Sequence, residues 1–269
     1  DLQAMRELCR QRFYIIDMAS DLKRKVIALL DQVFPEYEKL FSDSFGLSSM
    51  ELLSQYTTPE EMLSVSSQQL AEVLKKASRG RLGAEKAVEI HDAAKNSFGI
   101  VMASSSFSLI IRQYIEQIRS LESSVDIFDT EIARLLSGFD TQLTTITGIG
   151  STLAAVILSE IGGDIRRFSS PAKLAAYAGV DPTVKQSGDF SGTRIKMSKR
   201  GSPYLRRAIW LASTVAAFKD PVIHALYERK RAEGKDHMTV IGHVCRKMIS
   251  IIFAVLRDNT PYVPAGISD

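Results

Sequence analysis

A repeating pattern of apolar residues predicts a long helix at the start of the chain, over residues 2–33. Four of these residues recur every seven positions: Leu8, Ile15, Leu22 and Leu29. Further apolar side chains three or four positions away widen the stripe, and this spacing places them on one face of an α-helix. Pro35 has no amide hydrogen and is expected to end the helix.

A stricter pattern predicts a second long helix over residues 111–135. Its apolar residues alternate spacings of three and four through four heptads: Ile111, Tyr114, Ile118, Leu121, Val125, Phe128, Ile132 and Leu135. The positions between them are mostly charged or polar, which is typical of a coiled coil, and a core helix of a bundle is the alternative. We expect the two long helices to pair with each other as an antiparallel hairpin, or with a second chain in a homo-oligomer.

Residues 45–98, between the long helices, are predicted to form a small insert of three short helices. Thr58 and Pro59 have the residue types of a helix start, with a hydroxyl cap followed by proline at the first helical position. Ser66 and Gln69 repeat a capping pattern, and the stretch AEKAVEIHDAAK is helical again.

From residue 141 onward, glycine and proline separate shorter apolar helices. After the first of these helices, the next four are expected to start at Ser170, Ser202, Asp220 and His237. No segment has the alternating pattern of a strand, so the predicted fold class is all-α. We predict two domains: a coiled-coil hairpin with its helical insert over residues 1–140, and a helical C-terminal domain over residues 141–269.

Charge is divided unequally along the 269 residues, although the net charge is only +3. Residues 1–140 contain 16 Lys and Arg against 21 Asp and Glu, whereas residues 141–269 contain 18 against 10. A basic half joined to an acidic half indicates that only the C-terminal half contacts a polyanion.

Several classes of protein are excluded by composition. Two cysteines, Cys9 and Cys245, indicate a reducing compartment rather than a disulfide scaffold. Together with four scattered histidines they lack the spacing of a zinc site, so no metal is expected in this chain. The longest apolar run, residues 248–256, is too short to span a bilayer, and no membrane partner is expected.

The strongest candidate for chemistry is the basic stretch, which we define as residues 184–207. It contains one acid and seven cations: Lys185, Arg194, Lys196, Lys199, Arg200, Arg206 and Arg207. A solvated loop is the simplest explanation. However, Lys and Arg spaced among glycine and serine neutralise phosphates and release counterions, which predicts nucleic-acid binding without sequence readout.

Gly148 and Gly150 precede a helix in the turn ITGIG, a pattern that suggests a helix-hairpin-helix element. Glycines there allow tight backbone conformations that expose amides at a helix N-terminus, where a phosphate binds. An ordinary glycine turn between core helices is the alternative.

A serine in the basic stretch has the chemistry to attack a phosphodiester and hold the cut end covalently. Ser187 and Ser191 each precede a glycine, and their residue types do not distinguish them. Other candidate groups are expected to be core or capping residues: Tyr177, Tyr204, His224 and His243.

Four motifs follow one another over residues 146–207: G-I-G before a helix, F-x-S-x-x-x-L-A-x-Y-A-G, Q-S-G and S-K-R-G-x-x-x-L-R-R. Together they resemble the C-terminal domain of the DEDD-type insertion-sequence transposases, a family that includes Piv-type DNA invertases. The long helices and the stretches TTPEEM and ASRGRLG fit the middle region of that family. The resemblance therefore covers nearly the whole chain.

The resemblance implies a recombinase in which a C-terminal serine acts together with an N-terminal RuvC-like domain whose four carboxylates bind metal. In that family the RuvC-like domain precedes the first long helix, where this sequence begins. We therefore expect a fragment that lacks the domain and is inactive alone, with Mg²⁺ at the missing domain and no cofactor in this chain. Counted back from Ser198, the serine of the family falls on Ser187.

The resemblance also implies DNA as a partner, a structured guide RNA in some members, and a cytoplasmic, nucleoid-associated location in a bacterial or archaeal cell. Two other hypotheses stay open. One is a noncatalytic helix-hairpin-helix module that holds branched DNA or RNA. The other is a coiled-coil assembly scaffold whose basic stretch only keeps it soluble.

Overall fold

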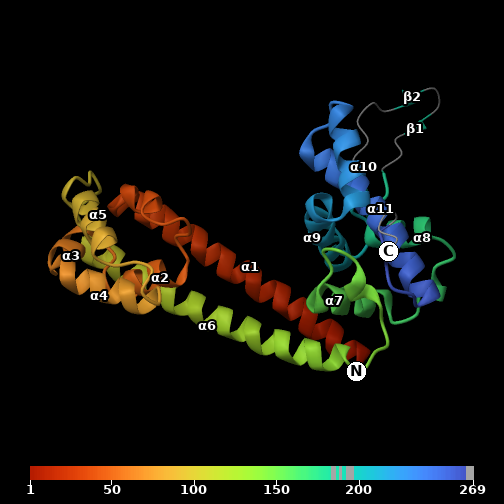
Figure 1. The fold of residues 1–269 in the computed structure, drawn as a ribbon, viewed down its shortest axis with the longest axis horizontal. Coiled ribbons are helices and arrows are strands. Elements are labelled where there is room, and N and C mark those ends of the chain that lie inside the picture. The colour runs from red at the N-terminus through yellow and green to blue at the C-terminus, as the bar shows by residue number, and fades with distance from the viewer. Residues whose placement is uncertain (183–185, 188–189, 192–196, 265–269) are drawn as a thin grey trace. The chain divides into compact units, whose positions relative to one another are not determined.

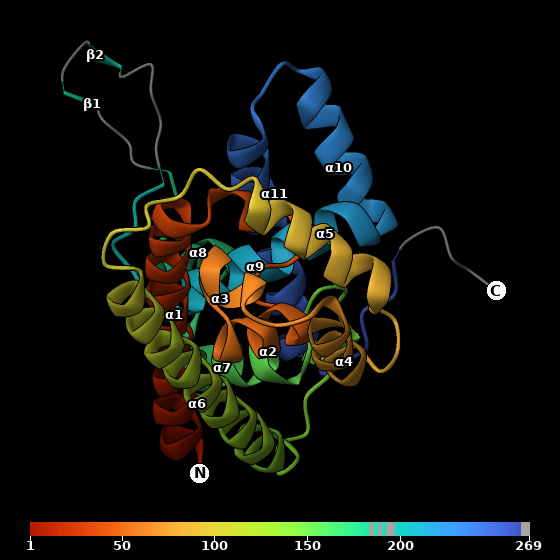
Figure 2. The same ribbon diagram turned by 90° about the vertical axis from the view of Figure 1, so that its left-hand side faces the viewer.

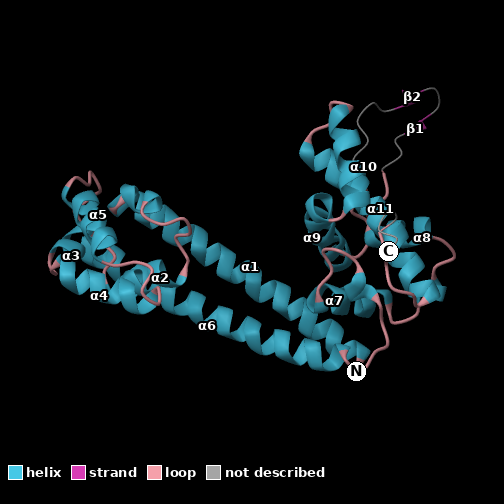
Figure 3. Cartoon of the chain, in the orientation of Figure 1, coloured by secondary structure: helices cyan, strands magenta, loops and turns pink. Residues whose placement is uncertain are grey.

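The computed structural model describes residues 1–182, 186–187, 190–191 and 197–264, and of the two short pairs it describes the backbone alone. Helices dominate these residues (Figure 3), which confirms the predicted all-α class. The chain divides into two compact units. Unit 1 contains Asp1–Arg12 and Ile127–Asp269, and unit 2 contains Phe13–Asp126.

Two long helices each contribute to both units: α1 (Leu2–Val33) and α6 (Ser104–Leu136). They contain the two helices predicted from the heptad patterns, and α1 ends before Pro35. Within unit 2 they run antiparallel (Figures 1 and 2), and Lys23 Nζ lies 2.7 Å from Glu122 Oε1. The compact units divide these helices themselves, so a domain boundary at residue 140 stays a prediction.

Burial is uneven along the heptad stripe of α6. Ile111, Ile115 and Ile118 are completely buried, whereas Leu121 and Val125 are only half-buried. The short helices of unit 2 cover the first group, because all three isoleucines belong to the same core cluster as residues of those helices. The coiled-coil interpretation stays a prediction.

The insert of unit 2 contains four α-helices, whereas the sequence predicted three. They are α2 (Leu47–Gln55), α3 (Pro59–Leu63), α4 (Ser67–Ala77) and α5 (Ala84–Lys95), preceded by the 3-10 turn η1 (Pro35–Lys39). The predicted caps of α3 and α4 are confirmed, since Thr58 accepts from Glu61 N and Ser66 forms a capping box with Gln69. Helix α2 was not predicted from the sequence, because its N-cap is Gly46, which has no capping side chain.

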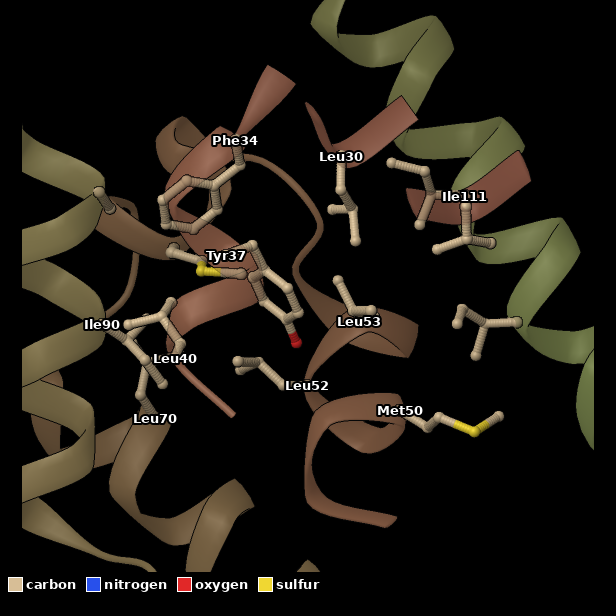
Figure 4. Packing of buried hydrophobic residues seen from close by; sticks show 14 of the residues in the cluster. Leu30, Phe34, Tyr37, Leu40, Met50, Leu52, Leu53, Leu70, Ile90 and Ile111 are labelled. Carbon is tan, nitrogen blue, oxygen red and sulfur yellow. The ribbon is translucent and has the colours of Figure 1, made fainter. Parts of the chain in front are cut away.

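Aromatic residues that follow α1 occupy the centre of the unit 2 core (Figure 4). The rings of Phe34 and Tyr37 meet edge to face with centroids 5.8 Å apart, and both are completely buried. The Tyr37 hydroxyl lies 2.8 Å from Ser49 Oγ, and burial raises the pKa of the phenol. Its buried oxygen is therefore paired, as a stable core requires.

Glu61 of α3 connects the insert to α6 in unit 2. Its carboxylate accepts hydrogen bonds from Ser108 Oγ at 2.6 Å and from Arg112 Nη2 at 2.7 Å, and also from the backbone amide of Thr57 at 2.7 Å. Burial alone would raise the pKa of Glu61, but these hydrogen bonds and the charge of Arg112 outweigh it and lower the pKa.

Replacing Glu61 with glutamine is expected to destabilise unit 2 by about 1 kcal/mol at pH 7, because the charge-assisted hydrogen bonds are lost. Glu61 has a lowered pKa in the folded state, so its contribution is fully present above the unfolded value of about 4.3 and disappears as the pH falls through the folded value. Chemical denaturation of both proteins at pH 7 and at pH 3 measures this. Glu60→Gln, at the exposed neighbouring position, is the control, and an equal stability gap at both pH values would contradict the prediction.

Among the described residues of unit 1 there are five α-helices besides the segments of α1 and α6. They are α7 (Ser151–Ile161), α8 (Pro171–Ala178), α9 (Pro203–Lys219), α10 (Pro221–Ala232) and α11 (His237–Asp258), with 3-10 turns η2 (Leu143–Thr145) and η3 (Ile165–Arg167). The predicted starts are confirmed. Side chains of Ser170, Ser202 and Asp220 each accept hydrogen bonds from amides of the following first turn.

Helix α11 is the core helix of unit 1 and packs against α8, α9 and α10. By length and composition it is the one helix among the described residues that is apolar enough to cross a bilayer. Half of its most apolar window is buried inside the protein, and Val240, Val244 and Met248 are completely buried. The apolar face of α11 thus packs in the core, and the expectation of no membrane partner stays a prediction.

Both cysteines are free and buried in unit 1. Burial raises the pKa of Cys9 to about 12 and that of Cys245 to about 11. Because the thiolate is the reactive form, we expect neither thiol to react with a disulfide reagent at pH 8 in the folded protein. The same protein in guanidinium chloride should show two reactive thiols, and fast labelling of one thiol before unfolding would contradict the prediction.

Candidate nucleic-acid interface

Backbone hydrogen bonds join a segment that precedes the basic stretch to a segment within it. Residues 177–182, at the end of α8, lie antiparallel to residues 197–202, which lead into α9, and we call these two segments the loop base. Its backbone bonds, donor first, are Ser198 to Asp181 (2.8 Å), Lys199 to Gly179 (3.0 Å) and Ser202 to Tyr177 (2.8 Å). Pro182 and Met197 form an antiparallel bridge beyond them. The segment after α8 is therefore joined to the segment that leads into α9, and the two flank residues 183–196 in the sequence.

Two glycines allow the segments of the loop base to approach this closely. Gly179 ends α8 in the left-handed conformation with φ of +69°, and a Cβ there would lie 2.7 Å from the Gly201 nitrogen. A Cβ on Gly201 would overlap the carbonyl oxygen of Tyr177. Neither position accepts a side chain without displacing backbone atoms.

Farther along, the backbone of the basic stretch pairs with itself. Strand β1 (Gln186–Ser187) is antiparallel to strand β2 (Phe190–Ser191), and Ser187 lies opposite Phe190. These two-residue strands do not alter the all-α class. Outside the described residues are the side chains of Ser187 and Ser191 and the whole of Lys185, Arg194 and Lys196.

Four predicted phosphate contacts are described, and they differ in their surroundings. Lys199 and Arg200 are exposed at the loop base. Arg206 Nη1 donates to the carbonyl of Ala178 at 3.2 Å and thus stabilises the end of α8, while Arg207 is half-buried on α9. Phosphate binding by all four stays a prediction.

The glycine turn before α7 is confirmed, and its first glycine has a packing role. Gly148 has φ of +89°, and a Cβ there would lie 2.5 Å from the carbonyl oxygen of Ala212 on α9. Gly150 is exposed and is the N-cap of α7, without a capping side chain. A 3-10 turn, η2, precedes the turn, so the helix-hairpin-helix assignment and phosphate binding at the α7 amides stay predictions.

A buried carboxylate connects α1, α7 and α9 beneath the loop base. Glu160 of α7 is 2% exposed and accepts hydrogen bonds from Arg10 Nε at 2.7 Å and Arg10 Nη2 at 3.2 Å. Ser202 Oγ donates to the same carboxylate at 2.9 Å while accepting from Leu205 N at 3.1 Å. The residue that caps α9 is thereby fixed to α7.

Above this carboxylate is an open cavity of about 400 Å³. We call it the tyrosine cavity, and its lining residues are Arg10, Glu160, Tyr177, Arg200, Gly201, Ser202, Pro203 and Tyr204. The Arg10 guanidinium lies 4.9 Å from the centroid of the Tyr204 ring. Sequence patterns did not point to Arg10 or Glu160 as site residues. The one available signal was a lone carboxylate in the apolar run AAVILSEIGG.

Comparison with known protein families covers this part of the chain. Residues 140–228 match the model of the transposase IS116/IS110/IS902 family. The matched range contains α7, α8, the loop base and α9, which together form the framework of the basic stretch.

Individual relatives extend the similarity beyond that range. A protein of insertion element IS110 from Streptomyces coelicolor is 28% identical over 93% of this chain and 64% of its own length. A protein of insertion element IS900 from Mycobacterium paratuberculosis is 28% identical over 85% and 57%. A pilin gene-inverting protein from Moraxella bovis is 29% identical over 58% and 51%. The chain thus spans less than two thirds of the length of these relatives.

Two tyrosines in the part that matches the transposase family were predicted to be core residues, but neither is fully buried. Tyr177 is 39% exposed, and its hydroxyl donates to the carbonyl of Glu160 at 3.0 Å. Tyr204 is half-buried beside Arg10. Both rings line the tyrosine cavity, Tyr177 as the first residue of the loop base and Tyr204 in the first turn of α9.

The two histidines considered as general bases lie away from the loop base in sequence. His224 Nδ1 lies 2.9 Å from the carbonyl oxygen of Ala217 in the last turn of α9, which fits the predicted capping role. His243 is half-buried, and its pKa is lowered by burial and by the charge of Arg246.

The transposase resemblance implies a metal site in a RuvC-like domain, not in the residues described here. No three His, Cys, Asp or Glu side chains among them are grouped so that they could hold a metal ion. The described residues therefore do not fit such a site.

Proposed function

We propose that this chain is the C-terminal part of a transposase or recombinase that binds DNA and supplies Ser187 as the nucleophile for strand cleavage and exchange. The observation that carries the proposal is the loop base. It anchors a stretch with seven cations on α8 and α9, within residues that match a transposase family. Exposed Lys199 and Arg200 at that base supply positive charge where a phosphate strand would approach.

In the proposed reaction, the Ser187 hydroxyl oxygen attacks the scissile phosphorus. An oxygen–phosphorus bond to serine forms while the bond from phosphorus to the 3′ oxygen breaks. The serine loses its proton and the departing 3′ oxygen gains one, so the protons balance. A 3′ hydroxyl from another strand later attacks the phosphoserine, which releases Ser187 and joins the new strands. Cations of the basic stretch stabilise the charge on phosphorus.

Assembly through the long helices is a second part of the proposal. Unit 2 has an open cavity of about 360 Å³ along the half-buried stretch of the helix pair, lined by Met18 and Leu22 of α1 and by Gln117 and Leu121 of α6, among others. An apolar, incompletely covered seam supports pairing with a second chain in a homo-oligomer. A guide RNA and a RuvC-like domain that carries Mg²⁺ are further expectations from the family resemblance.

Covalent trapping tests the proposed nucleophile. The chain is extended to the full length of its relatives and incubated with a nicked DNA duplex, then denatured and separated by size. Wild type is expected to form a protein–DNA link, and Ser187→Ala should reduce it below detection. Ser191→Ala is the matched control and should retain the link. A link formed by Ser187→Ala would remove Ser187 from this role, whereas DNA binding without any link would support the noncatalytic module.

Charge reversal at the loop base tests the phosphate contacts. Lys199→Glu and Arg200→Glu are each expected to weaken DNA binding similarly for all sequences and to reduce the slope of log affinity against log salt by about one per residue. Fluorescence anisotropy over a range of salt concentrations measures both effects. Affinity that depends little on salt in wild type would favour the scaffold hypothesis, and a loss confined to one sequence would contradict a phosphate role.

A further inference from the structure

The tyrosine cavity combines features that no motif in the sequence assigned. Residues of the loop base, among them Tyr177 and Arg200, line it, so a strand bound at Lys199 and Arg200 would pass close to it. Its volume of about 400 Å³ is within the usual range of small-ligand sites, and its lining combines two aromatic rings with a few polar groups.

One lining residue of the cavity, Tyr177, has its ring held in place by two contacts. The Tyr177 ring packs on Phe168 with centroids 5.2 Å apart, and its hydroxyl donates to the Glu160 carbonyl at 3.0 Å. The ring is nevertheless 39% exposed. A fixed, partly exposed ring is a platform on which a flat group stacks at little entropic cost.

Two guanidinium groups, those of Arg10 and Arg200, add positive charge to the lining of the cavity. Arg10 is held by two hydrogen bonds to Glu160 and lies 4.9 Å from the centre of the Tyr204 ring. The buried carboxylate pairs with that guanidinium, so the two charges largely offset each other. Arg200 also lines the cavity, is exposed, and adds a positive charge suited to a phosphate.

We propose that the tyrosine cavity holds one unpaired nucleotide of the bound DNA strand, with its base stacked on Tyr177 and its phosphate beside Arg200. Stacking requires no hydrogen-bond readout, so the site accepts any base and recognises that the nucleotide is out of the duplex. The inference rests on the proposed function, because the nucleotide belongs to the strand that the basic stretch binds. It adds that part of the bound DNA is single-stranded at the loop base.

An abasic scan tests the cavity with the chain as it stands. Single-stranded DNA oligonucleotides, each lacking one base but keeping every phosphate, are compared by fluorescence anisotropy. We expect one position, or two adjacent positions, at which loss of the base weakens binding about 5- to 150-fold. Tyr177→Leu should weaken binding to the intact strand by a similar factor and remove the penalty at that position. Tyr177→Phe keeps the ring and should bind within about threefold of wild type.

Salt dependence separates stacking from charge. Tyr177→Leu should leave the salt slope unchanged, whereas Arg200→Ala should reduce it by about one. An RNA strand of the same sequence is run in parallel, and a penalty seen only with RNA would overturn the assignment to DNA. Circular dichroism and thermal melting establish that each variant is folded.

Two outcomes distinguish failure of this inference from failure of the proposed function. Salt-dependent DNA binding with a flat abasic scan, unchanged by Tyr177→Leu, would overturn the nucleotide site while leaving the basic stretch as a DNA contact. A duplex that binds as tightly as a single strand and competes fully with it would overturn the site as well. Absence of DNA binding in wild type would remove both proposals.

Discussion

Replacing Gly201 with alanine is expected to disrupt the loop base and destabilise unit 1 by about 2 to 4 kcal/mol. A Cβ at this position would overlap the Tyr177 carbonyl oxygen, which also accepts the hydrogen bond from Ser202 N. The clash involves backbone on both sides, so no change of side-chain rotamer relieves it. The segments must separate, and the hydrogen bonds that hold the basic stretch lengthen or break.

Thermal unfolding and hydrogen exchange measure this effect at two levels. The Tm of Gly201→Ala should fall by roughly 5 to 10 °C, and the amides of Ser198, Lys199 and Ser202 should lose protection. Gly242→Ala in α11 is the matched control, because a Cβ there meets nothing within 4 Å and alanine suits a helix better than glycine. It should raise stability slightly. A Gly201→Ala protein with wild-type Tm and protection would refute the close approach.

The helices of this chain were predictable because their signals are local. Apolar periodicity located α1 and α6, and capping residues such as Ser66, Ser170 and Ser202 located the starts of shorter helices within one residue. Helix α2 was missed because a glycine occupies its N-cap. Such signals depend on spacings of a few residues, so they can be recognised in the sequence without knowledge of the tertiary structure.

The candidate site was only partly predictable because its closure depends on distant pairs. The composition of the basic stretch identifies it in the sequence. The antiparallel pairing of residues 177–182 with residues 197–202 could not be predicted, because these segments lack the alternating pattern of strands. Arg10 and Glu160 are separated by 150 positions, so no window of sequence connects them. Gly148 was predicted as a phosphate-binding turn, and the structure adds a packing reason for the same glycine, its approach to Ala212.

The connection between α1 and the loop base has a mechanical consequence. Arg10 and Ser202 both bond to Glu160, so one carboxylate fixes the beginning of α1 and the beginning of α9 to the end of α7 within unit 1. Ser202, at the end of the loop base, therefore cannot move relative to these helix ends without breaking a buried hydrogen bond. The position of this end of the loop base is set by buried side chains of unit 1.

Replacing Glu160 with alanine should consequently destabilise unit 1 by about 2 to 3 kcal/mol. The carboxylate is 3% exposed, and its removal leaves the Arg10 guanidinium and the Ser202 hydroxyl without their acceptor. The cost stays below that of a fully buried pair because the Arg10 side chain is 37% exposed and regains some contact with water. Glu160→Gln keeps an acceptor oxygen and the side-chain volume, so it should be less damaging than alanine.

Chemical denaturation of the variants measures the loss, and a surface ion pair supplies the contrast. Glu131 and Arg134 form an ion pair at 2.6 Å on α6 with side chains 42% and 67% exposed, so Glu131→Ala should change stability little. If Glu160→Ala were as stable as Glu131→Ala, the buried carboxylate would not hold the loop base. Arg10→Ala should lose less than Glu160→Ala, since the remaining carboxylate still accepts from Ser202 and the space left by Arg10 joins the open cavity, so that water can enter and hydrogen-bond to it. Reversal of that order would mean that the cation, rather than the carboxylate, organises the junction of α1, α7 and α9.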